Sequence, residues 1–176
     1  MKGIYSYGDK TPRVGEGSMI APGARVIGDV SIGKDCGIFY NAVLRGDINS
    51  IEIGDNSNVQ DNATVHLAHD KGVRIGKNVT IGHNAVVHAC TVEDGCIIGM
   101  GAIVMDGAVI GHNSIVGAGS LVTSGKVFPP HSLITGTPAR MVRALTPEEI
   151  ASTETSAANY VRVKDQILRS LERDLQ

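Results

Sequence analysis

Three histidines in one stretch of the chain, His66, His83 and His88, are of a type and spacing that could bind a metal ion. A neutral imidazole is a common ligand of zinc and of other transition metals. His66 and His88 each directly follow a valine, whereas His83 lies two positions after an isoleucine. Whether the three side chains can share one ion depends on the elements that carry them.

Aliphatic residues recur every six positions through most of the chain. A period of six fits neither an α-helix nor a plain strand, and it is the hexapeptide pattern of a parallel β-helix. We therefore predict an all-β triangular prism in which three hexapeptides make one coil. Chance spacing in a β-sandwich does not account for so many registered positions, which are Val14, Ile20, Val26, Ile32, Ile38 and Leu44; Ile53, Val59 and Val65; Ile75, Ile81 and Val87; and Val92, Ile98, Val104, Ile110, Val116 and Val122.

The six-residue spacing is broken in three places. Three extra residues fall at positions 46–48, and four more at positions 69–72. We expect both groups to form loops at prism corners, since the backbone of a loop must reach water. One residue is missing between Val87 and Val92.

Counting hexapeptides, with the extra residues ignored, places Arg45, His66 and His88 on one face of three successive coils. Each follows an inward-pointing aliphatic residue, so its own side chain points outward. Neighbouring strands lie about 4.8 Å apart. We therefore expect His66 and His88 to share a metal ion.

His83 falls on the preceding face, together with Gln60 and Asp61, and cannot easily join the other two histidines within one chain. Three prisms about a threefold axis, with the first face of each chain against the second face of the next, would bring it there. The sequence thus predicts a homotrimer with three identical metal sites, each built by two chains.

Composition argues against several other classes of function. The 176 residues include 16 basic and 18 acidic side chains, for a net charge of −2, so we expect neither a nucleic-acid nor a membrane partner. No apolar run resembles a signal peptide or a membrane span. The odd number of cysteines, Cys36, Cys90 and Cys96, favours reduced thiols. We expect a soluble, cytoplasmic protein.

The hexapeptides end after Val122, and a helix is predicted beyond them. Thr146-Pro147-Glu148-Glu149 has the pattern of a helix start, with an N-cap threonine, a first-turn proline and a capping-box glutamate. We expect a β-helix domain with the metal site over residues 1–145, and a helix that packs on the prism over residues 146–176. Its apolar residues follow near helical spacing, at Tyr160, Ile167, Leu168, Leu171 and Leu175.

The stretches LRGDINSIEIG, NVQDNATVH and VTIGHNAVVHAC make the chain similar to the γ-class carbonic anhydrases, which are left-handed hexapeptide prisms. The resemblance covers nearly the whole chain, including the C-terminal helix. It implies a metal, usually zinc or iron, that three histidines hold across a trimer interface. His66 and His88 match the ligands from one chain, and His83 matches the ligand from its neighbour. We therefore expect Zn²⁺ as the cofactor, with Fe²⁺ or Co²⁺ as alternatives.

The same resemblance implies catalytic roles for four further residues. Gln60 matches a residue that holds the metal-bound hydroxide, Arg45 and Asp61 match a pair that links subunits, and Asp47 matches the partner of that pair. The implied reaction is the reversible hydration of CO₂ to bicarbonate by that hydroxide. The segment after Arg45 is too short for the acidic, proton-shuttling loop of the archaeal relatives.

Three other functions stay open at this stage. The metal could serve an acyl-CoA thioesterase, or the trimer could bind metal without turnover. The segment GAGSLVTSGKVFPPHSLITGTPARMVR also resembles the coil ends of hexapeptide acyltransferases, which use a single histidine and no metal. His112 would be the candidate for that role.

Five other residues could be mistaken for parts of the site. His69, among the extra residues, could relay protons or be a solvated loop histidine. We expect His112 and His131 to lie away from the metal. Cys90 is expected to be a small packed residue rather than a ligand. Tyr160 could close over the site, but we expect it to pack against the prism.

Overall fold

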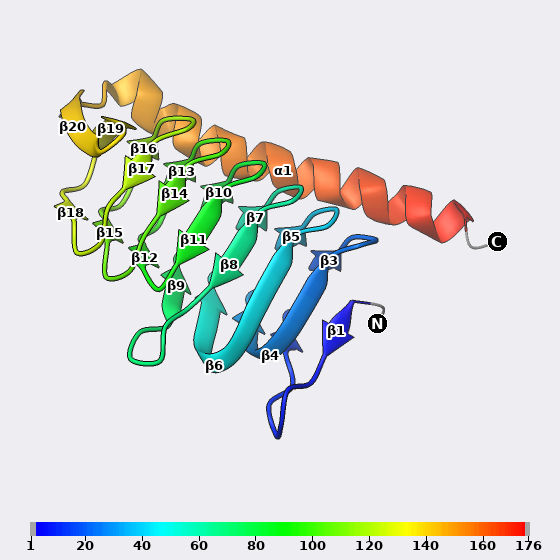
Figure 1. Ribbon diagram of the computed structural model, residues 1–176. Coiled ribbons are helices and arrows are strands. Elements are labelled where there is room, and N and C mark those ends of the chain that lie inside the picture. Colours follow the sequence, from blue (N-terminus) through cyan, green and yellow to red (C-terminus); the bar gives the residue numbers. More distant parts are fainter. Residues whose placement is uncertain (1–2, 175–176) are drawn as a thin grey trace.

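The computed structural model describes residues 3–174 as a left-handed prism of stacked β-coils with one long helix along it (Figure 1). The β-helix prediction is therefore confirmed. Leu175 of the predicted helix, and the outermost residues of the two predicted domains, lie outside the described residues.

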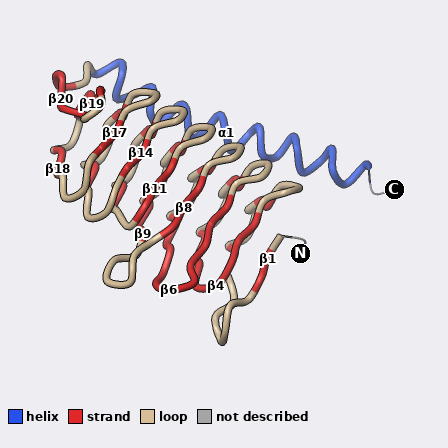
Figure 2. Tube along the Cα trace, in the orientation of Figure 1, coloured by secondary structure: helices blue, strands red, loops and turns tan. Residues whose placement is uncertain are grey.

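Three ladders of short, parallel strands form the faces of the prism, and their connecting turns stack along its edges (Figure 2). Face 1 contains β1 (Ile4–Tyr5), the first halves of β4 (Arg25–Ile32) and β6 (Val43–Ile53), β8 (Thr64–His66), β11 (Val86–His88), β14 (Ile103–Val104) and β17 (Leu121–Val122). Face 2 contains β3 (Met19–Ile20), β5 (Gly37–Ile38), β7 (Asn58–Val59), β10 (Thr80–Ile81), β13 (Ile97–Ile98), β16 (Ile115–Val116) and β19 (Ser132–Gly136), to which β20 (Ala139–Ala144) adds an antiparallel strand. Face 3 contains β2 (Arg13–Val14), the second halves of β4 and β6, β9 (Val73–Ile75), β12 (Thr91–Val92), β15 (Val109–Ile110) and β18 (Val127–Phe128).

The register between coils agrees with the count of hexapeptides. Leu44 pairs with Val65, and Val65 pairs with Val87, so the three inward residues stack on face 1. All three are fully buried. Burying a side chain of this size stabilises the fold by about 1.5–3 kcal/mol. The column of aliphatic residues therefore fixes which neighbouring residues point outward.

The extra residues at positions 46–48 do not form a loop, and this part of the prediction is wrong. They belong to β6, which runs without a break from Val43 to Ile53. Gly28 pairs with Gly46 and Val30 with Ile51, so β6 carries three more residues than β4 between these pairs. The long partner strand β4 continues across the corner, and the extra residues are accommodated as a bulge.

The extra residues at positions 69–72 do form a loop, as predicted. Backbone hydrogen bonds between Ala68 and Lys71 close it, and His69 is exposed within it. The side-chain amide of Asn49, in the bulge of β6, donates to the carbonyl oxygen of His69 at 3.1 Å. The two irregular segments therefore lie against each other at the corner between faces 1 and 3.

Helix α1 (Pro147–Asp174) runs back along face 2 toward the N-terminal end of the prism (Figure 1). Its start is the predicted capping box, because the Thr146 hydroxyl accepts from the Glu149 N–H and the Glu149 carboxylate accepts from the Thr146 N–H. Lys164 is buried and donates to the carbonyl oxygen of Gly17 at 2.7 Å. A buried ammonium is costly without hydrogen-bond partners, so this contact fixes the helix on the prism. Among the described residues, no helix is long and apolar enough to span a membrane.

The three cysteines are buried free thiols, so we expect stability to fall at alkaline pH. Burial raises the pKa of Cys36 to about 11 and the pKa of Cys90 and Cys96 to about 12. Below about pH 8.5 each thiol is mostly protonated in both the folded and the unfolded protein. Above this pH the thiols of the unfolded chain ionise, while those of the folded protein stay protonated. The free energy of unfolding should then fall by up to about 1.4 kcal/mol per thiol for each pH unit until the folded thiols ionise.

Urea denaturation at pH 8, 9 and 10 measures this slope. A variant with all three cysteines changed to alanine starts from a lower stability and should show a clearly shallower slope. Equal slopes in the two proteins would contradict the attribution of this pH dependence to the buried thiols.

Candidate metal centre

His66 and His88 lie one above the other on face 1, at the ends of β8 and β11. The two residues are direct partners in the parallel ladder. Their ring centroids are 5.2 Å apart, and Nδ1 of His66 faces Nε2 of His88 at 3.2 Å. Two ligands at the tetrahedral angle about zinc, with bonds of 2.0–2.1 Å, have nitrogens roughly 3.3 Å apart. The pair therefore has the spacing of two ligands on one ion.

A carboxylate lies at the outer nitrogen of each ring. His66 Nε2 is 3.1 Å from Asp47 Oδ1, and His88 Nδ1 is 2.7 Å from Asp106 Oδ1. If both outer nitrogens donate to these carboxylates, both inner nitrogens of neutral rings carry lone pairs. Lone pairs that face each other favour a cation between them. We call Asp47, His66, His88 and Asp106 the site column, and its donors fit a metal ion.

Asp47 is itself held by Arg45, which contacts its second carboxylate oxygen. Partial burial acts to raise the pKa of Asp47, but hydrogen bonds from His66, from its own backbone N–H and from Arg45 outweigh this effect. The pKa of Asp47 therefore lies below its usual value. The carboxylate stays ionised at neutral pH and keeps accepting from His66.

His83 lies in the turn between β10 and β11, at the corner between faces 2 and 1. A hydrogen bond from the Ala85 N–H to the Gly82 oxygen closes this turn, and Asn84 has a φ of 58°, as a type II turn requires at that position. A Cβ on Gly82 would lie 2.8 Å from the backbone nitrogen of Met100 in the next coil. The local sequence Gly-His-Asn thus places the imidazole at the tip of a tight turn.

Asp61 stands one coil below His83 at the same corner and pairs with it. Its Oδ2 is 3.0 Å from Nδ1 of His83, while its Oδ1 accepts from the backbone N–H of Tyr40 at 3.1 Å. The imidazole Nε2 is then the nitrogen left for a metal. His83 therefore also has a carboxylate at one ring nitrogen, as His66 and His88 do.

Gln60, next to Asp61, is buried, with 3% of its surface exposed. Its amide nitrogen donates to Asn58 Oδ1 at 3.1 Å, and the Asn58 amide donates to the hydroxyl of Thr80 at 3.0 Å. These contacts fix the side chain on the His83 side of the corner. Gln60 does not face His66 and His88 within one chain.

Helix α1 changes the packing predicted for neighbouring chains. It covers face 2 with Tyr160, Ile167 and Leu168, which pack on a small cluster around Phe39. Face 2 is therefore not free to meet face 1 of another prism as we predicted, and the corner with Asp61 and His83 is the part that remains exposed. Within residues 3–174, no three His, Cys, Asp or Glu side chains of one chain converge on a common metal position.

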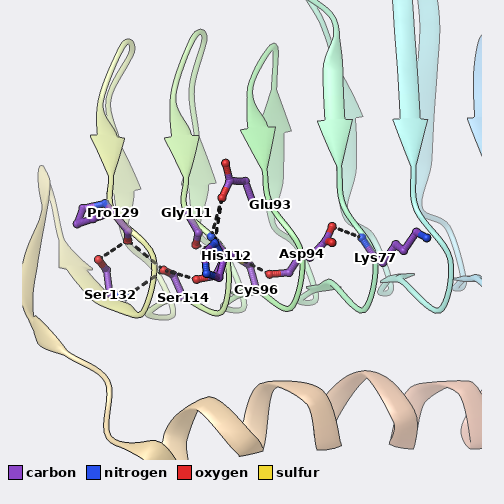
Figure 3. Close-up of polar contacts among 9 residues, drawn as sticks. All are labelled: Lys77, Glu93, Asp94, Cys96, Gly111, His112, Ser114, Pro129 and Ser132. Carbon is purple, nitrogen blue, oxygen red and sulfur yellow. Dashed lines mark hydrogen bonds and ion pairs between the residues drawn. The ribbon is translucent and has the colours of Figure 1, made fainter.

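The remaining candidate residues are not part of the site column. His112 lies beside Glu93 at the corner between faces 3 and 2 (Figure 3). Its ring also packs edge-on against the ring of His131, with the two ring centroids 5.1 Å apart. Cys90 is buried, as predicted for a packed residue. Tyr160 packs edge-on against Phe39 at 5.7 Å, which confirms the expected packing role.

Asp106 is the residue that the sequence analysis missed. It stands eighteen residues after His88, one more than the seventeen that separate Val87 from its partner Val104 in the same two coils. The hexapeptide count therefore places Met105, and not Asp106, above His88 and gave no signal for Asp106. The repeat is one residue short after Val87, and the backbone there is left-handed. Ala89, directly after His88, has a φ of 47°. A left-handed alanine is strained by about 1 kcal/mol or more. The tight turn there brings His88 and Asp106 together on successive coils.

Known proteins resemble this chain over nearly its full length. Residues 29–66 match the hexapeptide repeat of succinyl-transferase, and residues 89–124 match the bacterial transferase hexapeptide. A probable carbonic anhydrase of Methanocaldococcus jannaschii is 46% identical over 83% of this chain and 92% of its own. A carbonic anhydrase of Geobacillus kaustophilus is 39% identical over 96% of this chain and 92% of its own. The solved structure of a hexapeptide transferase family protein from Anaplasma phagocytophilum has a TM-score of 0.91 and 44% identity, covering 94% of this chain and 99% of its own.

Shorter alignments reach longer proteins. Gamma carbonic anhydrase 3 of Arabidopsis thaliana is 53% identical over 34% of this chain and 23% of its own length. An uncharacterised Dictyostelium discoideum protein is 55% identical over 37% of this chain and 26% of its own. This chain thus aligns with about a quarter of each of these two relatives.

The fold and the site column together define a hexapeptide-repeat β-helix protein with a paired-histidine half-site. With relatives of this identity and coverage, the chain belongs to the γ-class carbonic anhydrase family.

Proposed function

We propose that this protein is a homotrimeric, metal-dependent carbonic anhydrase that interconverts CO₂ and bicarbonate. The observation that carries the proposal is the pair of facing nitrogens on His66 and His88, 3.2 Å apart, in a chain of the γ-class family. One chain supplies two of the three ligands that the family resemblance implies. The third, His83, would come from a neighbouring chain.

An exposed apolar surface supports association beside the site column. Met100, Ile103 and Met105 lie on face 1 and at its corner with face 2, and they are 59%, 39% and 37% exposed. An exposed apolar surface is a common site of contact with another chain. A neighbour that covers this surface with its own corner would bring His83, Gln60 and Asp61 toward the site column of the first chain.

Each residue of the proposed site has a defined task. His66, His83 and His88 would hold the ion, Zn²⁺ by preference, with Fe²⁺ or Co²⁺ as alternatives. When bound, such an ion supplies Lewis acidity, which makes water a nucleophile at neutral pH. Asp47 and Asp61 would fix the orientation of the His66 and His83 rings. Arg45 steadies Asp47 within the chain and would reach Asp61 of the neighbour.

Gln60 would orient the reacting oxygen from the His83 side of the interface. Its contact with Asn58 holds the amide in one position, so a hydrogen bond to the substrate would cost little reorganisation. Hydration of CO₂ releases one proton, and the exposed His69 in the neighbouring loop is available to carry it to solvent.

A transferase is the second candidate function, because a close structural relative carries that name. His112 would be its reactive histidine, on the corner at the edge of a groove of about 890 Å³ along face 3. The metal site takes no part in that reaction. Thioester hydrolysis would instead use the same three histidines.

Removal of the metal should abolish CO₂ hydration, whereas removal of the His112 side chain should not. We expect stopped-flow assays on protein purified without oxygen to show rapid hydration that a chelator reduces to the buffer rate. Zn²⁺ or Fe²⁺ should restore it, and His112→Ala should keep the full rate. Metal bound in each chain without hydration would contradict the proposed reaction and direct the assay to acyl-CoA thioesters.

Two inactive variants should complement each other in a mixed trimer. His83→Ala and His88→Ala homotrimers should each lose their metal, since every site lacks one ligand. In any mixed trimer, one interface of the three joins an intact His66–His88 pair to an intact His83. Co-expression with two affinity tags, followed by metal analysis, should find one ion per mixed trimer. Full metal content in the His83→Ala homotrimer would refute a site shared between chains.

A further inference from the structure

Asp106 is a carboxylate that the proposed reaction does not itself require, yet it contacts a proposed ligand more closely than any other side chain does. Its Oδ1 lies 2.7 Å from Nδ1 of His88. Asp106, in the turn after β14, and His88, at the end of β11, are both partly exposed, with 40% and 32% of their side chains accessible. An exposed polar contact of this kind contributes little to folding. Its close geometry therefore points to a role at the site.

The backbone around Asp106 is fixed by the coils on both sides. The Gly107 N–H donates to the backbone carbonyl oxygen of Ala89, in the coil below, at 2.7 Å. The Gly125 N–H, in the coil above, donates to the backbone carbonyl oxygen of Asp106 at 2.8 Å. The backbone of Asp106 is thus held in place whether or not its carboxylate contacts His88. A rigid acceptor can select one orientation of a mobile partner.

His88 needs such a partner more than His66 does. It directly precedes the strained Ala89, where the repeat is one residue short, and its ring is more exposed than that of His66, at 32% against 19%. His66 is oriented by Asp47, which Arg45 holds in turn. Asp106 is the equivalent carboxylate for His88, at the other end of the site column.

We propose that Asp106 is a positioning residue, which fixes the ring of His88 so that Nε2 is directed at the divalent metal ion. The inference rests on the proposed function for the presence of that ion. It assigns to this chain a carboxylate–histidine–metal unit at Asp106 and His88. Loss of such an outer partner typically weakens metal binding by about 10–100-fold.

Competition of the trimer with a chromophoric chelator for Zn²⁺ tests this role. Asp106→Ala should weaken zinc binding by about 10–100-fold, and Asp106→Asn, whose carbonyl oxygen can still accept from Nδ1, should recover part of the loss. Glu52→Gln removes one exposed carboxylate from face 3 and should match the wild type. Light scattering on each variant shows whether the trimer is intact.

The visible spectrum of the Co²⁺ protein gives a second readout. Asp106→Ala should alter the ligand-field bands, while Glu52→Gln leaves them unchanged. An intact Asp106→Ala trimer with a zinc affinity within twofold of the wild type and an unchanged Co²⁺ spectrum would overturn the inference. If Asp106→Ala does not form trimers, Asp106→Leu, which is of similar size but has no acceptor for Nδ1, replaces it, and wild-type affinity and spectrum in that variant overturn the inference equally.

Failure of the proposed function would give different results from failure of the role proposed for Asp106. Wild-type protein that binds metal but does not hydrate CO₂ would refute the reaction, and the competition experiment would still decide the role of Asp106. Wild-type protein that binds no divalent metal would overturn both.

Discussion

The hydrogen-bonded register between successive coils is the constraint on which the site depends. Because Val65 pairs with Val87, His66 must lie beside His88, and because Val59 pairs with Ile81, Asp61 must lie beside His83. A shift of one residue in either ladder would turn these side chains inward. The buried aliphatic column prevents that shift, since it would expose Val and Ile to water. The core thus stabilises the fold and aligns the histidines of the candidate site at the same time.

The same register keeps the two halves of the site apart within one chain. The site column lies at one edge of face 1, whereas His83 lies at the corner with face 2, on a turn set by Asn84. Helix α1 covers face 2 and leaves that corner exposed. Each prism therefore presents the proposed half-site and the proposed third ligand on different surfaces. Assembly, rather than a conformational change, is what would complete the site.

The features that follow from the six-residue period could be predicted from the sequence, whereas contacts that depend on tertiary packing could not. Six-residue spacing and the capping box at Thr146 sufficed for the prism, the stacked histidines and the helix. The spacing predicts a loop at residues 46–48, where the structure has a bulge, because the length of the partner strand β4 cannot be read from spacing. Asp106 was missed since its contact with His88 follows from the tight turn at Ala89, which the repeat shows only as a missing residue. Likewise, the sequence predicted helix α1 but not which face it covers.

We propose that one ion joins His66 and His88 of one chain to His83 of another. A crystal structure of the zinc-loaded protein, with data recorded on both sides of the zinc absorption edge, would test this arrangement. We expect one anomalous peak per chain between the facing nitrogens of His66 and His88, with His83 of the neighbouring chain as the third protein ligand. A peak that lacks a ligand from a second chain, or that lies at His112, would contradict it.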